Sequence, residues 1–179
     1  EPLERVWWSA PLDDTFIHFD FARSFAHWRP FEWTPGGGYS SGATSWLYPM
    51  LLGVFEATGS EGQSLGTIAD VIACVSVLAF LLATRSLFGE LKTWVSYLLP
   101  PLVLTSGVLG WSLWSGMELA LFFGVWGGLA YAYAEYRRAV DPGARALFRR
   151  VMAFFGLLVV MTRPEALLCV GWFALFAGL

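Results

Sequence analysis

The sequence predicts an all-α protein, a polytopic bundle of transmembrane helices with interfacial helices in a first extracytoplasmic loop. Two observations carry this prediction. Of the 179 residues, 56% are hydrophobic and only 14% are charged, whereas an average soluble domain is about 25% charged. Long apolar runs also recur along the chain, and a helix needs about 20 such residues to cross a bilayer. A membrane is therefore the expected solvent for most of this chain.

Apolar runs place five helices in residues 64–179, the expected membrane domain. Their expected limits are about 64–86, 94–114, 117–136, 148–163 and 166–179. Pro100 and Pro101 interrupt the second run, but a packed membrane helix tolerates proline because neighbouring groups satisfy the freed backbone atoms. The sequence starts without methionine and stops within an apolar run. We therefore expect it to be a fragment of a longer membrane domain.

The last apolar stretch is interrupted by Arg163, Pro164 and Glu165. A single kinked helix would hold two charges inside the membrane, at a cost of several kcal/mol. The alternative is two helices, the first surfacing at Arg163 and the second returning. We favour the second arrangement.

Residues 1–63 are expected to form the extracytoplasmic loop. The loop over residues 137–150 holds five arginines against one aspartate, and the turn over residues 85–92 adds two basic residues. Positive residues concentrate on the cytoplasmic side of membrane proteins, so both segments are expected there. Alternation of the helices then places residues 1–63, Glu118 and Arg163 on the opposite face.

Two adjacent acids, Asp13 and Asp14, stand where an amphipathic interfacial helix is expected to begin. Aspartate is a favoured helix N-cap, so capping alone is one interpretation of the pair. Adjacent helical residues point about 100° apart, so the second carboxylate can face a cavity. There it is suited to take a proton from a hydroxyl as a general base.

His18 follows Asp14 by one helical turn, a spacing at which the two side chains could share a metal ion. A lone histidine on an interfacial helix is more often a hydrogen-bonding residue, so we expect no metal site and no cofactor, although a divalent metal stays possible. His18 is instead a candidate substrate contact.

The segment over residues 34–45 is rich in glycine and serine. It lacks the lysine and the preceding strand of a phosphate-binding loop. It is either a flexible connection or a close-fitting wall of a saccharide pocket, in which Trp33, Tyr39 and Trp46 are available to stack on sugar rings. A short apolar helix, interfacial or re-entrant, should follow over residues 44–57.

Glu118 interrupts an apolar run, and acids in such places are usually functional or paired. Pairing with an arginine and a direct substrate role are equally compatible with its position. Arg163 is the best candidate to hold a phosphate, because a guanidinium binds phosphate oxygens bidentately. Glu165 is a further substrate-site candidate, or it simply neutralises Arg163.

Four segments in order resemble the membrane glycosyltransferases of the C superfamily, closest to bacterial relatives of protein O-mannosyltransferases and mycobacterial arabinofuranosyltransferases. They read D-D-T-F-I-H-F-D-F-A-R, P-G-G-G-Y-S-S-G-A-T-S-W-L-Y, S-G-M-E and R-P-E-A-L. The resemblance covers residues 12–167. Trp46 and Tyr48 depart from the family pattern, so the pocket and its sugar should differ.

The resemblance implies an inverting hexosyl- or pentosyltransferase that uses a polyprenyl-phosphate sugar as donor. It implies Asp13 or Asp14 as the general base and Arg163 near the donor phosphate. The acceptor would be a glycan, lipid or protein hydroxyl, and the site would face the outside of a bacterial inner membrane. The alternative function is a non-catalytic membrane scaffold or transporter subunit. A net charge of −3, with no basic stripe, argues against nucleic-acid binding.

Overall fold

The protein is all-α, as predicted. A computed structural model describes residues 14–88 and 93–177. The helices are α1 (Asp14–Ala26), α2 (Leu47–Glu56), α3 (Gln63–Leu87), α4 (Thr93–Leu104), α5 (Gly107–Trp114), α6 (Leu119–Arg138), α7 (Pro142–Thr162), the 3₁₀ turn η1 (Pro164–Ala166) and α8 (Leu167–Ala177). Across these described ranges, β-type pairing is limited to an isolated bridge between Glu32 and Tyr39.

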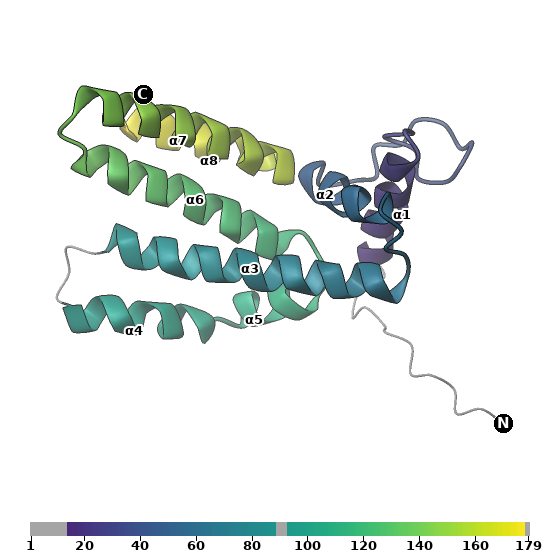
Figure 1. The fold of residues 1–179 in the computed structure, drawn as a ribbon, viewed down its shortest axis with the longest axis horizontal. Coiled ribbons are helices and arrows are strands. Elements are labelled where there is room, and N and C mark those ends of the chain that lie inside the picture. The colour runs from purple at the N-terminus through teal and green to yellow at the C-terminus, as the bar shows by residue number, and fades with distance from the viewer. Residues whose placement is uncertain (1–13, 89–92, 178–179) are drawn as a thin grey trace.

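The helices form two groups. The long helices α3, α6 and α7 lie side by side, with the shorter α4 beside α3, and α1 and α2 pack together at the end where α3 begins (Figure 1). The α5–α6 turn and the end of α7 lie at the same end of the long helices (Figure 1). Segments far apart in the sequence are therefore gathered beside α1.

Small residues bring α3 and α6 close together. A Cβ atom added at Gly124 would lie 2.8 Å from Ser76 Cβ and 2.9 Å from its Cα, and one added at Gly127 would lie 2.8 Å from Phe80 Cα. Small residues at helix contacts allow backbones to approach, which is how membrane helices commonly associate. This contact fixes the framework on which the site is built.

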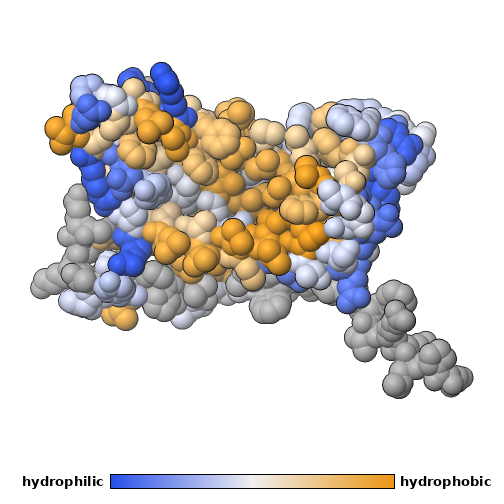
Figure 2. Space-filling view, in the orientation of Figure 1, coloured by the Kyte–Doolittle hydropathy of each residue, from blue (hydrophilic) through white to orange (hydrophobic). Residues whose placement is uncertain are grey.

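Among the described residues, one helix, α3, is long and apolar enough to cross a membrane. Figure 2 shows apolar surface over the middle of the long helices and polar residues gathered at their two ends. The side chains of Val71, Val75, Leu78 and Leu82 on α3 are more than half exposed. An exposed apolar face of this extent is typical of contact with lipid or with another apolar partner.

The expected helix over residues 94–114 is instead two helices. Its break lies at Thr105 and Ser106, beyond the two prolines. Thr105 donates from its hydroxyl to Leu102 O at 2.6 Å, and Ser106 is extended, with its carbonyl accepting from Leu109 and Gly110. Serine and threonine compete with helical hydrogen bonds in this way, which hydropathy does not register.

Helix α7 begins at Pro142, earlier than the expected residue 148. Asp141 caps it, accepting a hydrogen bond from Ala144 N at 2.7 Å, and proline fits the first helical position. The helix ends at Thr162, Arg163 is extended with φ −144° and ψ 105°, and the chain turns back through η1 into α8. This is the two-helix arrangement that the sequence favoured.

Candidate functional site

One face of α1 is buried against the turn that joins α5 to α6. The Thr15 hydroxyl donates to Ser115 O at 2.7 Å, and the Tyr48 hydroxyl of α2 donates to Gly116 O at 2.8 Å. Gly116 has φ +68°, and a Cβ atom there would lie 2.8 Å from Thr15 Cγ2. Only glycine fits this combination of backbone conformation and close contact, so the turn is shaped to receive α1.

Three segments meet in a chain of charged side chains. His18 Nε2 on α1 lies 3.0 Å from Glu118 Oε2, at the start of α6. Glu118 Oε1 lies 3.4 Å from Arg163 Nη2, in the break after α7. Arg163 Nε lies 3.0 Å from Glu165 Oε1. The structure thus brings together His18, Glu118, Arg163 and Glu165, four of the residues singled out in the sequence.

The cluster is buried at its centre and open at one end. Glu118 is 1% exposed and His18 is 3% exposed, whereas the Arg163 side chain is 32% exposed and that of Glu165 is 67% exposed. A buried charge is costly unless it is paired, and Glu118 has a partner on each side. The guanidinium of Arg163 therefore links a buried carboxylate to the surface.

The backbone holds Arg163 in this position. Its extended conformation ends α7 and turns its side chain away from the helical path. Trp46 N donates to Met161 O at 2.9 Å, which ties the start of α2 to the last turn of α7, and Thr162 is fully buried. The end of the Gly- and Ser-rich loop therefore lies beside the last turn of α7, two residues before Arg163.

Three buried polar atoms in this cluster have no aligned hydrogen-bond partner among the described residues: His18 Nδ1, Glu118 Oε2 and Arg163 Nε. The last two have close charged neighbours, but the atoms are not aligned for a hydrogen bond. Buried polar groups are nearly always satisfied, so such a concentration is informative. Two of the three atoms lie 3.0 Å from an ion-pair partner, so His18 Nδ1 is the one left without such a neighbour among the described residues.

Asp14 begins α1 and is exposed. It precedes His18 by one helical turn, so the two side chains project from neighbouring positions on the same side of the helix. Its carboxylate is accessible to solvent. Asp13, the other acid of the pair, lies outside the described residues.

Tyr39 and Trp46 lie on the loop between α1 and α2, where both rings pack on Phe31. The centroid distances are 6.1 Å for Tyr39 and 4.9 Å for Trp46, and both side chains stay largely open, at 78% and 47% exposure. They form an aromatic surface of the loop around Phe31.

Sequence reasoning missed the part played by Thr15 and Tyr48. Both are fully buried polar residues. Burial raises the pKa of the Tyr48 hydroxyl, and the carboxylates of Glu118 and Asp70 raise it further, so Tyr48 is a stable hydrogen-bond donor. Gly116, the glycine in S-G-M-E, was the one signal in the sequence that could have indicated a side chain packed closely on this turn.

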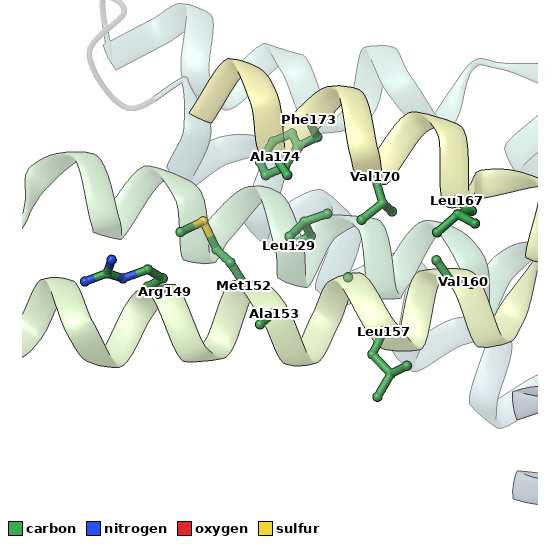
Figure 3. Close-up of a pocket in the computed structure, with 11 residues that line it drawn as sticks. Leu129, Arg149, Met152, Ala153, Leu157, Val160, Leu167, Val170, Phe173 and Ala174 are labelled. Atoms are coloured by element: carbon green, nitrogen blue, oxygen red, sulfur yellow. The ribbon is translucent and has the colours of Figure 1, made fainter. Parts of the chain in front are cut away.

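A cavity lies along α7, between α6 and α8. It has a volume of about 400 Å³, and its lining is apolar except for Arg149 at one end (Figure 3). Val160 and Leu167 mark its other end, on either side of the Arg163 break. Apart from Arg149 the lining carries no polar group, so the cavity suits a hydrocarbon chain.

Within residues 14–88 and 93–177, no group of three or more histidine, cysteine, aspartate or glutamate side chains is placed to hold a metal ion.

No protein family, curated protein or solved structure matches this chain.

Proposed function

We propose that this chain is part of a polytopic membrane glycosyltransferase that moves a sugar from a polyprenyl-phosphate donor to an acceptor hydroxyl outside the cytoplasm. The observation that carries the proposal is the meeting of His18, Glu118 and Arg163 in one ion-pair chain, with Asp14 one helical turn before His18 on α1. Each of these three residues comes from a different segment that resembles the same enzyme superfamily, and their contacts join the three segments in one polar cluster.

The arrangement around Arg163 suits a lipid phosphate. Its Nη2 and Nε atoms face carboxylates, and a guanidinium has five N–H donors in a planar fork, so Nη1 is left to bind phosphate oxygens. The apolar cavity along α7 ends at Val160, one turn before Arg163. A polyprenyl chain lying in that cavity would bring its phosphate to the arginine.

The reaction needs one base and one group that stabilises the leaving phosphate. The carboxylate of Asp14 or Asp13 takes the proton of the acceptor hydroxyl, whose oxygen attacks the anomeric carbon. The bond from that carbon to the phosphate oxygen breaks, and the electron pair leaves with polyprenyl phosphate. Attack opposite the leaving group inverts the anomeric configuration, and Arg163 stabilises the charge that develops on the phosphate.

A membrane location supports the same function. The basic ends of α6 and α3, and the arginine-rich start of α7, lie at the end of the bundle opposite the charged cluster (Figure 1). By the positive-inside rule this distribution supports an extracytoplasmic position for the cluster, as on the outside of a bacterial inner membrane, where lipid-linked sugars are the available donors.

A second function is favoured by one observation. Glu118 is 1% exposed and lies between two basic side chains. Such an arrangement is equally compatible with a purely structural role, in which the ion pairs hold α1, α6 and the end of α7 together. In a non-catalytic scaffold or transporter subunit, Asp14 would then be dispensable.

The test is transfer of radiolabelled sugar by the full-length protein in proteoliposomes, with a panel of polyprenyl-phosphate hexoses and pentoses. Asp13→Asn, Asp14→Asn and Glu61→Gln should be compared, the last removing an exposed carboxylate of the same outer region. We expect the base variant to lose about 10²–10⁴-fold in rate and Glu61→Gln to be unchanged. Unchanged transfer in both aspartate variants would overturn the assignment of the base, and absence of transfer from every donor would overturn the function.

Arg163→Lys tests the phosphate contact separately. Lysine keeps the charge but lacks the bidentate fork, so we expect a higher KM for the donor and an unchanged KM for the acceptor. An effect confined to the acceptor would contradict the proposed role.

A further inference from the structure

Two adjoining cavities lie along the face of α1 opposite His18, and we call them together the groove. On a helix, Asp20 and Arg23 lie about 160° and 140° around the axis from His18. Two cavities, of about 330 Å³ and 290 Å³, share these two residues in their walls. The first is also lined by Ser24, His27, Arg29, Trp33, Thr34 and Pro35, and the second by Phe16, Phe19, Gly62, Gln63 and Leu65. Between Phe16 and His27 the groove follows about 16 Å of helix.

The middle of the groove is held by a fixed set of polar groups. Asp20 Oδ1 accepts from Arg23 Nη1 at 3.0 Å, and Asp20 Oδ2 accepts from the Trp33 indole at 3.3 Å. Arg23 Nε also lies 3.6 Å from Glu56 Oε1. Trp33 remains 44% exposed, so its ring is held at the groove with much of its surface open to a ligand.

A strained turn brings Trp33 and Arg29 back toward α1. Trp28 and Phe31 have φ +59° and +69°, a conformation that costs non-glycine residues about 1–3 kcal/mol each. Arg29 N donates to Ser24 O at 2.8 Å and Ser40 N donates to Phe31 O at 2.7 Å, which secures the turn. Strain of this kind persists where the surrounding structure holds it, and it clusters at ligand sites.

The chemistry of the groove matches a neutral, hydroxyl-rich ligand. Both arginines already have acidic partners, Arg23 with Asp20 and Glu56, and Arg29 with Glu32 at 3.8 Å. The three carboxylates offset the charge of the two arginines, so the groove has no excess of positive charge to attract an anion. Sugar hydroxyls can instead donate to the carboxylates and accept from the guanidinium groups, while the apolar face of a sugar ring packs on the indole.

We propose that this groove binds a neutral oligosaccharide chain. The Phe16 end of the groove lies half a helical turn from Asp14, so a chain laid along α1 leads toward the exposed acid. Its role as the acceptor or product glycan rests on the proposed function, whereas binding itself does not. The length of the groove predicts that oligosaccharides bind more tightly than the corresponding monosaccharide.

Calorimetric titration of the full-length protein in nanodiscs with neutral manno-, gluco- and arabino-oligosaccharides tests the proposal. Trp33→Ala should weaken binding at least tenfold, and Trp33→Phe should weaken it less because a ring remains. Asp20→Asn should weaken binding because its single acceptor oxygen cannot serve both Arg23 and the indole. Trp28→Asn is the matched control. Trp28 is 92% exposed and outside the lining, asparagine tolerates its positive φ, and its affinity should stay within twofold of the native value.

The thermal midpoint of each variant shows whether it is folded. Binding of neutral chains that Trp33→Phe and Asp20→Asn both leave unchanged would overturn the proposal, as would binding of acidic chains alone or of none. Binding is measured without donor, so it separates the two hypotheses. Neutral-chain binding without sugar transfer would overturn the proposed function and support oligosaccharide binding in the groove. Sugar transfer without chain binding would support the proposed function and overturn oligosaccharide binding in the groove.

Discussion

Replacing Glu118 by glutamine removes the central charge of the buried cluster while keeping its shape. The amide can still accept a hydrogen bond, but the cation or donor on each side loses its carboxylate. Glu118 is 1% exposed, and its partners are His18 at 3% and Arg163 at 32% exposure. The variant therefore isolates the value of the buried charge.

The expected loss follows from these exposures. Breaking a fully buried ion pair costs about 3–5 kcal/mol, but Arg163 is partly solvated and keeps Glu165, which reduces its share. The retained hydrogen-bonding capacity of glutamine reduces the loss further, toward the cost of about 1–3 kcal/mol for an unsatisfied buried group. We expect Glu118→Gln to lower the free energy of unfolding by about 1–3 kcal/mol.

Thermal and denaturant unfolding in detergent, followed by tryptophan fluorescence, measures this loss. Glu165→Gln is the control, because it removes a carboxylate from the same arginine at a site that is 67% exposed, where an ion pair contributes about 0–1 kcal/mol. Equal stabilities of the two variants would refute the argument that burial makes Glu118 the centre of the cluster.

Three further predictions concern the framework. Burial raises the pKa of Glu56 above its usual 4.5, against the lowering effect of Arg23. The folded protein therefore binds this proton more tightly than the unfolded chain does, and the free energy of unfolding falls as pH rises above 4.5. Glu56→Gln should flatten that fall and be at least as stable as the native protein at pH 7, and a variant less stable at pH 7 but equal below pH 4 would contradict this. Gly124→Ala should destabilise the protein by about 1–3 kcal/mol because the added methyl group pushes α3 away from α6. Gly171→Ala, with open space around it, should instead stabilise the protein by about 0.5–1 kcal/mol. If both substitutions moved the thermal midpoint in the same direction, the close contact between α3 and α6 would be contradicted. Asp141→Ala should cost about 1 kcal/mol by removing the N-cap of α7, measured by the same unfolding experiment, and no loss would show that the cap is not formed.

The sequence predicted the features that depend on local composition. Hydropathy located α3 and α6 to within a few residues, and the R-P-E interruption predicted the reversal after α7. The charge at Glu118 stood out because its surroundings are apolar. Each of these predictions needs only the residues within one or two helical turns.

The features that could not be predicted from the sequence depend on contacts between distant segments. That Thr15 donates to Ser115, and Tyr48 to Gly116, follows from the docking of α1 and α2, which no local pattern encodes. The break at Ser106 was hidden because serine and glycine barely alter the hydropathy of an apolar run. The pairing of His18 with Glu118 spans 100 residues and was likewise inaccessible, although both residues had been singled out.

The helical period of α1 connects the buried cluster with the outer groove. Thr15 and His18, three residues apart, face the α5–α6 turn, while Phe16, Asp20 and Arg23, spaced by four and three, line the groove on the other side. Both sets stand on a single three-turn helix, so a rotation or shift of α1 would displace both. A glycan chain bound as proposed would therefore also hold α1 in place, and with it Asp14, one helical turn before His18. Occupancy of the outer groove should therefore favour the arrangement in which the proposed base meets the acceptor.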